Sequence, residues 1–167
     1  MTLTSAQRAT LKTHVTGNSD TNTLYVANNL TGLAALLNAD AVPDFWVWRT
    51  SVSRDEYLGS TSVDATVFAW AGTGWITRSQ GERDAFNAMF DAAGTVNPSR
   101  ANVRQAFTDI FSGATAPAPA NRTHLATTSR RKATRTEKLF ATGTGSTASP
   151  GLLVVEGQIA TGDLVGL

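Results

Sequence analysis

The clearest hydrophobic pattern in the sequence lies between residues 78 and 113, where two apolar stripes recur at helical spacing. The first stripe consists of Ala85, Phe86, Met89, Phe90 and Ala93, and the second of Val103, Ala106, Phe107, Ile110 and Phe111. Ser79-Gln80-Gly81-Glu82 has the form of a capping box before the first stripe, and Asn97-Pro98 is a suitable start for the second helix. Two such helices can bury their stripes against each other, so residues 79–112 are predicted to form an αα-hairpin.

Two more helices are predicted in the first 40 residues. Thr4-Ser5-Ala6-Gln7 has a capping-box pattern, and the helix that it opens is expected to reach Gly17 with Ala6, Leu11 and Val15 facing inward. A polar turn is expected over Asn18–Asn22. A second helix is predicted to begin at Thr23 and to end before Pro43, because the residue before a proline is disfavoured in the helical region. Its apolar side consists of Val26, Leu30, Leu33, Ala34 and Leu37.

All four tryptophans lie between residues 43 and 77. Phe45–Trp48 is too uniformly apolar to be assigned by periodicity. Ser53-Arg54-Asp55-Glu56 has capping-box form and predicts a short helix through Leu58. Val63–Ile76, which contains two glycines, fits a broken helix and two short strands equally well. The tryptophans are expected to supply bulk to a core otherwise rich in alanine.

The C-terminal third is predicted to form a linker, a helix and an arm. Ala114–Ala120 contains two prolines among small residues and is expected to be the linker. Arg122–Phe140 is interpreted as a third long helix, although five threonines lower its propensity. Ala141–Gly151 resembles a flexible connector. The best strand candidate follows it, and its residues are Leu152, Leu153, Val154 and Val155. With no evident partner strand in the chain, this strand is expected to be disordered in the free monomer and to pair with another subunit.

These patterns predict a mostly α fold, namely a helical bundle around the αα-hairpin with an extended C-terminal arm that carries a short β-strand. The predicted parts are a helical body over residues 1–116, a basic helix over 117–140 and the arm over 141–167. At 167 residues the chain is long enough for one domain with an arm.

Charge is distributed unevenly along the chain, although the formal net charge is only +1. The segment 121–138 has six basic residues against Glu137 alone, a net charge of +5, whereas the rest has 8 basic and 12 acidic residues, a net charge of −4. The six basic residues are Arg122, Arg130, Arg131, Lys132, Arg135 and Lys138. Three interpretations remain open for them: contacts with DNA phosphates, docking on an acidic protein surface, or a solvated helix face.

Catalytic chemistry is hard to assemble from these residues, so we expect neither an enzyme nor a cofactor or metal site. The chain has no cysteine, which excludes disulfides and thiolate metal sites. Its two histidines, His14 and His124, lie in polar stretches without nearby carboxylate clusters and are interpreted as surface residues. Hydrolytic serine, phosphate-loop and dinucleotide motifs are absent from the sequence. We also expect no signal peptide and no membrane span, and therefore a soluble protein made in a cytoplasm.

Several segments resemble a family of small structural proteins of tailed phages. The segments are residues 43–50 (PDFWVWRT), 78–85 (RSQGERDA), 97–99 (NPS), 104–107 (RQAF), 130–135 (RRKATR) and 137–145 (EKLFATGTG). In size and layout the chain is similar to head-to-tail adaptor proteins of short-tailed phages. That resemblance implies a homo-oligomeric ring, usually a dodecamer, that sits beneath the portal protein, encloses the passing double-stranded DNA and carries the tail nozzle.

The resemblance therefore predicts a structural virion protein at the head–tail junction, with the basic helix and the arm over Leu152–Val155 as its partner-facing parts. Two alternatives remain open at this point. One is another minor head or tail protein of the virion, and the other is a small DNA-binding protein without sequence specificity that uses Arg122–Lys138.

Overall fold

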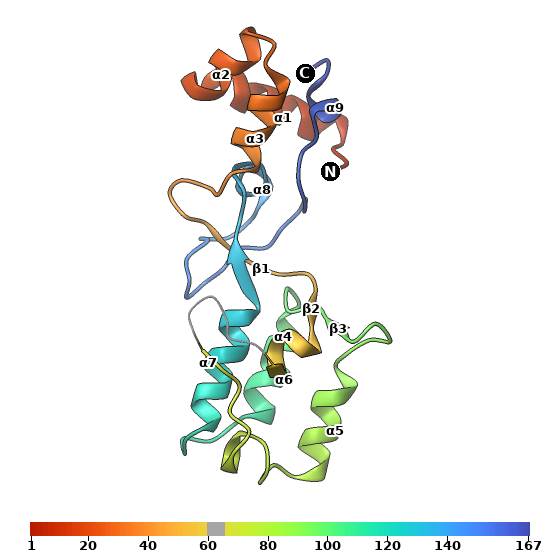
Figure 1. The fold of residues 1–167 in the computed structure, drawn as a ribbon, viewed down its shortest axis with the longest axis vertical. Coiled ribbons are helices and arrows are strands. Elements are labelled where there is room, and N and C mark those ends of the chain that lie inside the picture. The colour runs from red at the N-terminus through yellow and green to blue at the C-terminus, as the bar shows by residue number, and fades with distance from the viewer. Residues whose placement is uncertain (60–65) are drawn as a thin grey trace. The chain divides into compact units, whose positions relative to one another are not determined.

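The computed structural model describes residues 1–59 and 66–167 (Figure 1), so part of the ambiguous segment Val63–Ile76 lies outside the described residues. About 49% of the chain is helical and little of it is strand, which confirms the prediction of a mostly α fold. The chain divides into two compact units. Unit 1 consists of residues 1–47 and 132–167, and unit 2 of residues 48–131. The predicted division at residues 117 and 141 is therefore wrong.

The elements follow one another in the order of Figure 1. They are α1 (Ser5–Gly17), α2 (Ser19–Val26), α3 (Leu30–Asn38), β1 (Trp46–Trp48), β2 (Val52–Ser53), α4 (Arg54–Gly59), the 3-10 helix η1 (Gly72–Gly74), α5 (Gln80–Ala88), β3 (Thr95–Val96), α6 (Ala101–Ile110), α7 (Ala118–Thr128), β4 (Arg130–Lys132), α8 (Arg135–Phe140) and α9 (Thr161–Leu164). Among these strands, β1 neighbours β4 and β2 neighbours β3 in two separate two-stranded sheets.

Unit 1 is built on α1 and α3. The Thr4 capping box is present, because the Thr4 hydroxyl accepts from the Gln7 amide and the Gln7 side chain accepts from the Thr4 amide. Leu11 and Val15 are buried as predicted, whereas Ala6 is exposed. The core of unit 1 consists of Leu11, Val15, Leu33, Ala34, Leu37, Ile159, Leu164 and Leu167. Residues from both ends of the sequence thus share one core.

The helix predicted from Thr23 is two helices, and Asn18–Asn22 is mostly helical instead of a turn. The break follows from Asn28, which adopts a φ of 53°, a conformation that asparagine tolerates better than most residues. Asn29 then starts α3, since its side chain accepts from the Gly32 amide at 2.9 Å. Val26, predicted to face the core, is 73% exposed, because α2 packs against this core through Leu24 and Tyr25 instead.

Unit 2 contains the predicted hairpin. Helices α5 and α6 pack together, and Phe86 and Phe107 lie in the core with Ile110 and Phe111. The Ser79 capping box is present. Asn97, however, accepts from the Ser99 amide in a turn, and α6 begins only at Ala101. Residues 95–96 form β3, which pairs antiparallel with β2 in the register Val52↔Val96.

The prediction of a third long helix over Arg122–Phe140 is wrong, because residues 118–140 form α7, β4 and α8 in succession. Thr134 ends the extended segment and opens α8 through a capping box with Glu137. A threonine favours such a cap over a helix interior, since its hydroxyl can satisfy a free backbone amide. The chain passes from unit 2 to unit 1 between Arg131 and Lys132, so the predicted basic helix is divided between the units.

Candidate functional site

The six basic residues predicted to face a partner lie on three separate elements instead of one helix. Arg122 lies on α7, Arg130 and Arg131 lie on β4 with Lys132, and Arg135 and Lys138 lie on α8. In unit 1, Lys132 pairs with Asp44 at 2.9 Å and Arg135 pairs with Asp20 at 2.6 Å. The basic segment is thus neutralised in part by acidic side chains that lie far away in the sequence.

A cleft of about 540 Å³ in unit 1 brings Arg135 and Lys138 together with His14. The Lys138 ammonium donates to the Pro43 carbonyl at 3.0 Å, and Asp20 accepts from the Arg135 guanidinium. The Arg135 hydrogen bond is the main cause that lowers the pKa of Asp20. Both cations of the cleft are therefore paired, Arg135 with the Asp20 carboxylate and Lys138 with the Pro43 carbonyl. The cleft thus has a mixed polar surface, not a concentrated positive charge.

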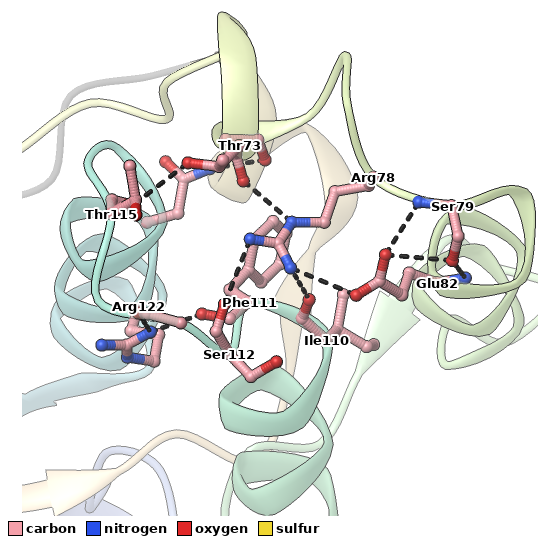
Figure 2. A network of polar contacts seen from close by, with 12 residues as sticks. Thr73, Arg78, Ser79, Glu82, Ile110, Phe111, Ser112, Thr115 and Arg122 are labelled. Carbon is pink, nitrogen blue, oxygen red and sulfur yellow. Dashed lines mark hydrogen bonds and ion pairs between the residues drawn. The ribbon is translucent and has the colours of Figure 1, made fainter.

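Arg122 has a different role, which it shares with an arginine that the sequence analysis did not select. The Arg122 guanidinium donates to the carbonyls of Phe111 and Gly113. Arg78 donates to the Ile110 carbonyl at 2.8 Å and to the Ser112 carbonyl at 3.3 Å (Figure 2). The last carbonyls of a helix have no partner within it. The two arginines therefore cap the C-terminal end of α6.

Arg78 also joins this helix end to two other segments. Its Nε donates to the Thr73 carbonyl at 2.8 Å, and its Nη1 lies 3.1 Å from Glu82 Oε1 (Figure 2). Glu82 in turn accepts from the Ser79 amide, which is the largest cause that lowers the pKa of Glu82. The predicted capping box is thus part of a larger polar network that holds η1, α5 and α6 together.

The predicted C-terminal arm is packed within unit 1. Gly151 and Leu152 make isolated bridges to Val47 and Thr142, and residues 153–155 belong to no strand. Farther on, Ile159 exchanges two hydrogen bonds with the Asn38 side chain, at 2.8 and 2.9 Å. The expectation that this segment lacks a partner in the chain is therefore wrong, because α1 and α3 present an apolar surface that Ile159, Leu164 and Leu167 cover.

The segment between residue 66 and α5 presents apolar side chains on the surface of unit 2. Val67, Trp70 and Ile76 are 57%, 47% and 67% exposed. The Ile76 amide donates to the Trp70 carbonyl at 3.2 Å, so these two residues are neighbours. The Trp70 ring also makes edge contacts with Phe68 and Trp75, whose centroids lie 5.0 and 5.9 Å away. We call Trp70 and Ile76 the exposed apolar cluster.

This cluster stands on a fixed backbone. The buried Asn121 side chain accepts from the Ala69 amide at 2.7 Å and donates to the carbonyls of Ala69 and Gly74. Gly74 approaches so closely that a Cβ there would lie 2.1 Å from the Ala69 carbonyl oxygen. Asn121 and Gly74 therefore fix the backbone conformation of residues 69–74, which positions the Trp70 side chain at the surface. Of the four tryptophans predicted to fill the core, Trp70 is exposed and the other three are only half-buried.

A buried polar network lies between α4 and α7. His124, expected on the surface, is fully buried. Its Nε2 lies 2.8 Å from the Tyr57 carbonyl, so this nitrogen carries the proton, and Nδ1 lies 3.0 Å from the Thr66 hydroxyl. Ser129 donates to the Leu125 carbonyl and lies 2.8 Å from the Tyr57 hydroxyl. Burial raises the pKa of Tyr57. Every ring nitrogen of His124 is satisfied internally, which gives this histidine a structural role.

Within residues 1–59 and 66–167, no group of three or more His, Cys, Asp and Glu side chains is arranged to hold a metal ion. No helix in this described part combines the length and the hydropathy of a membrane span.

Sequence reasoning missed Arg78, Asn121 and the exposed apolar cluster. Arg78 directly precedes the Ser79 cap, and that position was the available signal, because an arginine beside a helix start can reach the end of a neighbouring helix. Comparison with known proteins gives no match to a family model, to a curated protein or to a solved structure.

Proposed function

We propose that this protein is a structural component of a phage virion, a head-to-tail adaptor that forms a ring between portal and tail. The exposed apolar cluster is the observation that carries this proposal. Tryptophan is enriched where one protein binds another, and exposed large apolar residues gathered on one surface mark such binding sites. Because Asn121 and Gly74 fix the loop, the cluster needs little ordering when it binds, which favours affinity.

The resemblance of six sequence segments to tailed-phage structural proteins and the mostly α fold support the same function. The uneven charge along the sequence does not support this function, because the basic segment 121–138 is divided between the two units. Unit 1 has 5 basic and 6 acidic residues and unit 2 has 9 basic and 7 acidic residues, so neither unit is strongly charged. Subunit contacts in the ring are therefore assigned to apolar surface instead of to the predicted basic helix.

The alternative of a small DNA-binding protein loses its basis. It required five or more cations along one helix, whereas Arg122 caps α6 and Lys132, Arg135 and Lys138 hold partners within unit 1. Basic side chains that already form hydrogen bonds or ion pairs within the fold are less available to bind DNA phosphates. The broader alternative of another minor head or tail protein shares the apolar surface and differs only in its position in the particle.

Replacement of the exposed cluster tests the proposal. The double variant Trp70→Ser and Ile76→Ser removes exposed apolar area and is expected to remain folded. A loss of about 0.5–3 kcal/mol is expected, because the Trp70 ring also contacts Phe68 and Trp75. The same variant is expected to fail to complement a phage that lacks this gene, giving filled heads without tails. Val26→Ser, at a 73% exposed position of unit 1, is the matched control. Full complementation by the double variant would contradict the assigned surface.

A further inference from the structure

The cleft of about 540 Å³ in unit 1 has no part in the proposed function. Its volume lies within the range of about 300–1,000 Å³ that is usual for small-molecule sites. Residues from the end of α1, the start of α2, the segment after α3 and α8 line it. All of these segments belong to unit 1, so the cleft lies within one compact unit.

Lys138 supplies a positive charge that no acidic residue neutralises. Its ammonium donates to the Pro43 carbonyl at 3.0 Å, which uses one of its three N–H groups. Among residues 1–59 and 66–167, no carboxylate forms an ion pair with Lys138. Because a carbonyl oxygen carries no full charge, Lys138 keeps its own charge and has two N–H groups to spare.

The other cation of the cleft is already neutralised. Arg135 pairs with Asp20 at 2.6 Å, and Asp20 also accepts from the Thr21 amide at 2.8 Å. The described residues that line the cleft thus include two cations and one carboxylate, which gives a formal net charge of +1. A ligand with one negative charge balances it, whereas a phosphate monoester carries about −1.5 to −2 at pH 7.

His14 adds a neutral donor to the lining. The Asn18 side-chain nitrogen donates to the His14 carbonyl at 2.6 Å and lies 3.3 Å from His14 Nδ1. Nδ1 is therefore the acceptor, and the ring proton is on Nε2, which has no acceptor in the described part of the chain. The spare donors at Lys138 and His14 favour a carboxylate, which only accepts hydrogen bonds, over an amine, which needs an acceptor.

Apolar surface lies beside the Lys138 ammonium. Ala41, Val42 and Leu139 also line the cleft. Val42 directly precedes Pro43, whose carbonyl is 3.0 Å from Lys138 Nζ, so the charge and the apolar surface are close together. Small-molecule sites typically combine such an apolar lining with a few polar groups that fix the orientation of the ligand. A ligand that joins one anionic group to a hydrocarbon part matches both features.

We propose that this cleft binds a small organic monocarboxylate. The carboxylate accepts hydrogen bonds from the Lys138 ammonium, and the hydrocarbon part lies along Val42 and Leu139. The volume favours a free small molecule over the single acidic side chain of a partner protein. The proposal does not depend on the virion location of the protein, so failure of one leaves the other standing.

Titration of the isotopically labelled full chain with 4-phenylbutyrate tests the cleft. The backbone amide resonances of Ala41, Val42 and Leu139 are expected to shift until the site is saturated. The control ligand is 4-phenylbutanamide, which has the same hydrocarbon part and no charge. It is expected to bind at least about tenfold more weakly, because charge-assisted hydrogen bonds are stronger than neutral ones.

A lysine variant with a matched control tests the anchor of the carboxylate. Lys138→Met removes the ammonium, retains most of the aliphatic stem and is expected to weaken binding of 4-phenylbutyrate by about tenfold or more. Lys12→Met makes the same change at an exposed position of α1 that does not line the cleft. This control is expected to bind 4-phenylbutyrate with wild-type affinity.

A second pair of variants leaves Lys138 in place, so it decides the matter even if Lys138→Met does not fold. Val42 is 77% exposed, and substitutions there are expected to leave the chain folded. Val42→Glu places a competing carboxylate beside the Lys138 ammonium and is expected to weaken binding by about tenfold or more. Val42→Gln has the same size without the charge and is expected to stay within about threefold of the wild type.

Several results would overturn the proposal. Equal affinity for the acid and the amide, or no saturable shift with the acid, would show that the cleft does not recognise a carboxylate. Wild-type affinity in folded Lys138→Met would exclude Lys138 as the anchor. Tighter binding of inorganic phosphate would assign the cleft to phosphate, and tighter binding of the peptide acetyl-Ala-Leu-Glu-Leu-Ala-amide would assign it to an acidic side chain of a partner protein.

Discussion

The Arg78 side chain donates to the Ile110 carbonyl at 2.8 Å and thereby connects the start of α5 with the end of α6. The side chain of Arg78 is only 9% exposed, and it also reaches Thr73, Glu82 and Ser112 (Figure 2). One residue outside both apolar stripes thus fixes how the two helices of the hairpin meet.

Replacement of Arg78 by Ala is expected to lower the free energy of unfolding by about 1–3 kcal/mol, because carbonyls that it satisfies in a partly buried position would lose their donor. Arg54→Ala, at an exposed position, is the control and should change stability by less than about 0.5 kcal/mol. Urea unfolding monitored by tryptophan fluorescence measures both. Equal effects of the two variants would contradict the assigned role of Arg78.

Phe86 is the centre of the aromatic core of unit 2. It is fully buried, and its ring lies 5.4 Å from that of Trp75 and 5.2 Å from that of Phe90. Phe86→Ala is expected to cost about 3–5 kcal/mol through lost burial and a residual cavity. A thermal melt that shows a loss below about 1 kcal/mol would mean that this stripe does not face the core.

The capping box at Ser79 predicts a pH dependence. Hydrogen bonds from Ser79 and Arg78 hold the pKa of Glu82 below its ordinary value of 4.5. A lowered pKa in the folded state contributes stability that is present above the unfolded pKa and is lost as the pH falls through the folded one. The difference in melting temperature between the wild type and Glu82→Gln should therefore be largest above about pH 5 and should shrink below about pH 4.

Ser79→Ala provides the comparison for this experiment. It removes the hydroxyl that accepts from the Glu82 amide and is expected to cost about 0.5–2 kcal/mol. The charge on Glu82 and the Ser79 backbone amide both remain, so this loss should vary less with pH than that of Glu82→Gln. A pH profile of Glu82→Gln parallel to the wild type would show that the carboxylate is not stabilised in its charged form.

Hydrogen exchange distinguishes a packed C-terminal segment from a free arm. The Ile159 amide donates to the Asn38 side chain at 2.8 Å, and Ile159 is 2% exposed. We expect this amide to be protected in the isolated monomer and Asn38→Ala to lower its protection. Exchange of Ile159 at the rate of an unstructured peptide would restore the original prediction of a disordered arm.

Local signals predicted the elements that local chemistry determines. The capping boxes at Thr4, Ser53 and Ser79 each begin a helix, and the apolar stripes around Phe86 and Phe107 lie in the core. Such features depend on residues within one or two turns of each other, so the sequence contains nearly all the information they need.

The errors arise where distant residues decide the structure. Leu152–Val155 lacks a partner within its own neighbourhood, yet the C-terminal segment is held by Asn38 and by the core of unit 1. Arg135 belongs to a run of like charges in the sequence but pairs with Asp20 in the fold. A charge count along the chain cannot identify such a partner, because tertiary packing brings it close.

The proposed function is tested most directly by quantitative mass spectrometry of purified virions of a phage whose genome encodes this chain. A head-to-tail adaptor ring predicts that the chain is present in as many copies as the portal protein, and that it remains with the portal when particles are separated into heads and tails. Absence of the chain from purified particles, or a copy number that follows the major capsid protein, would contradict this function.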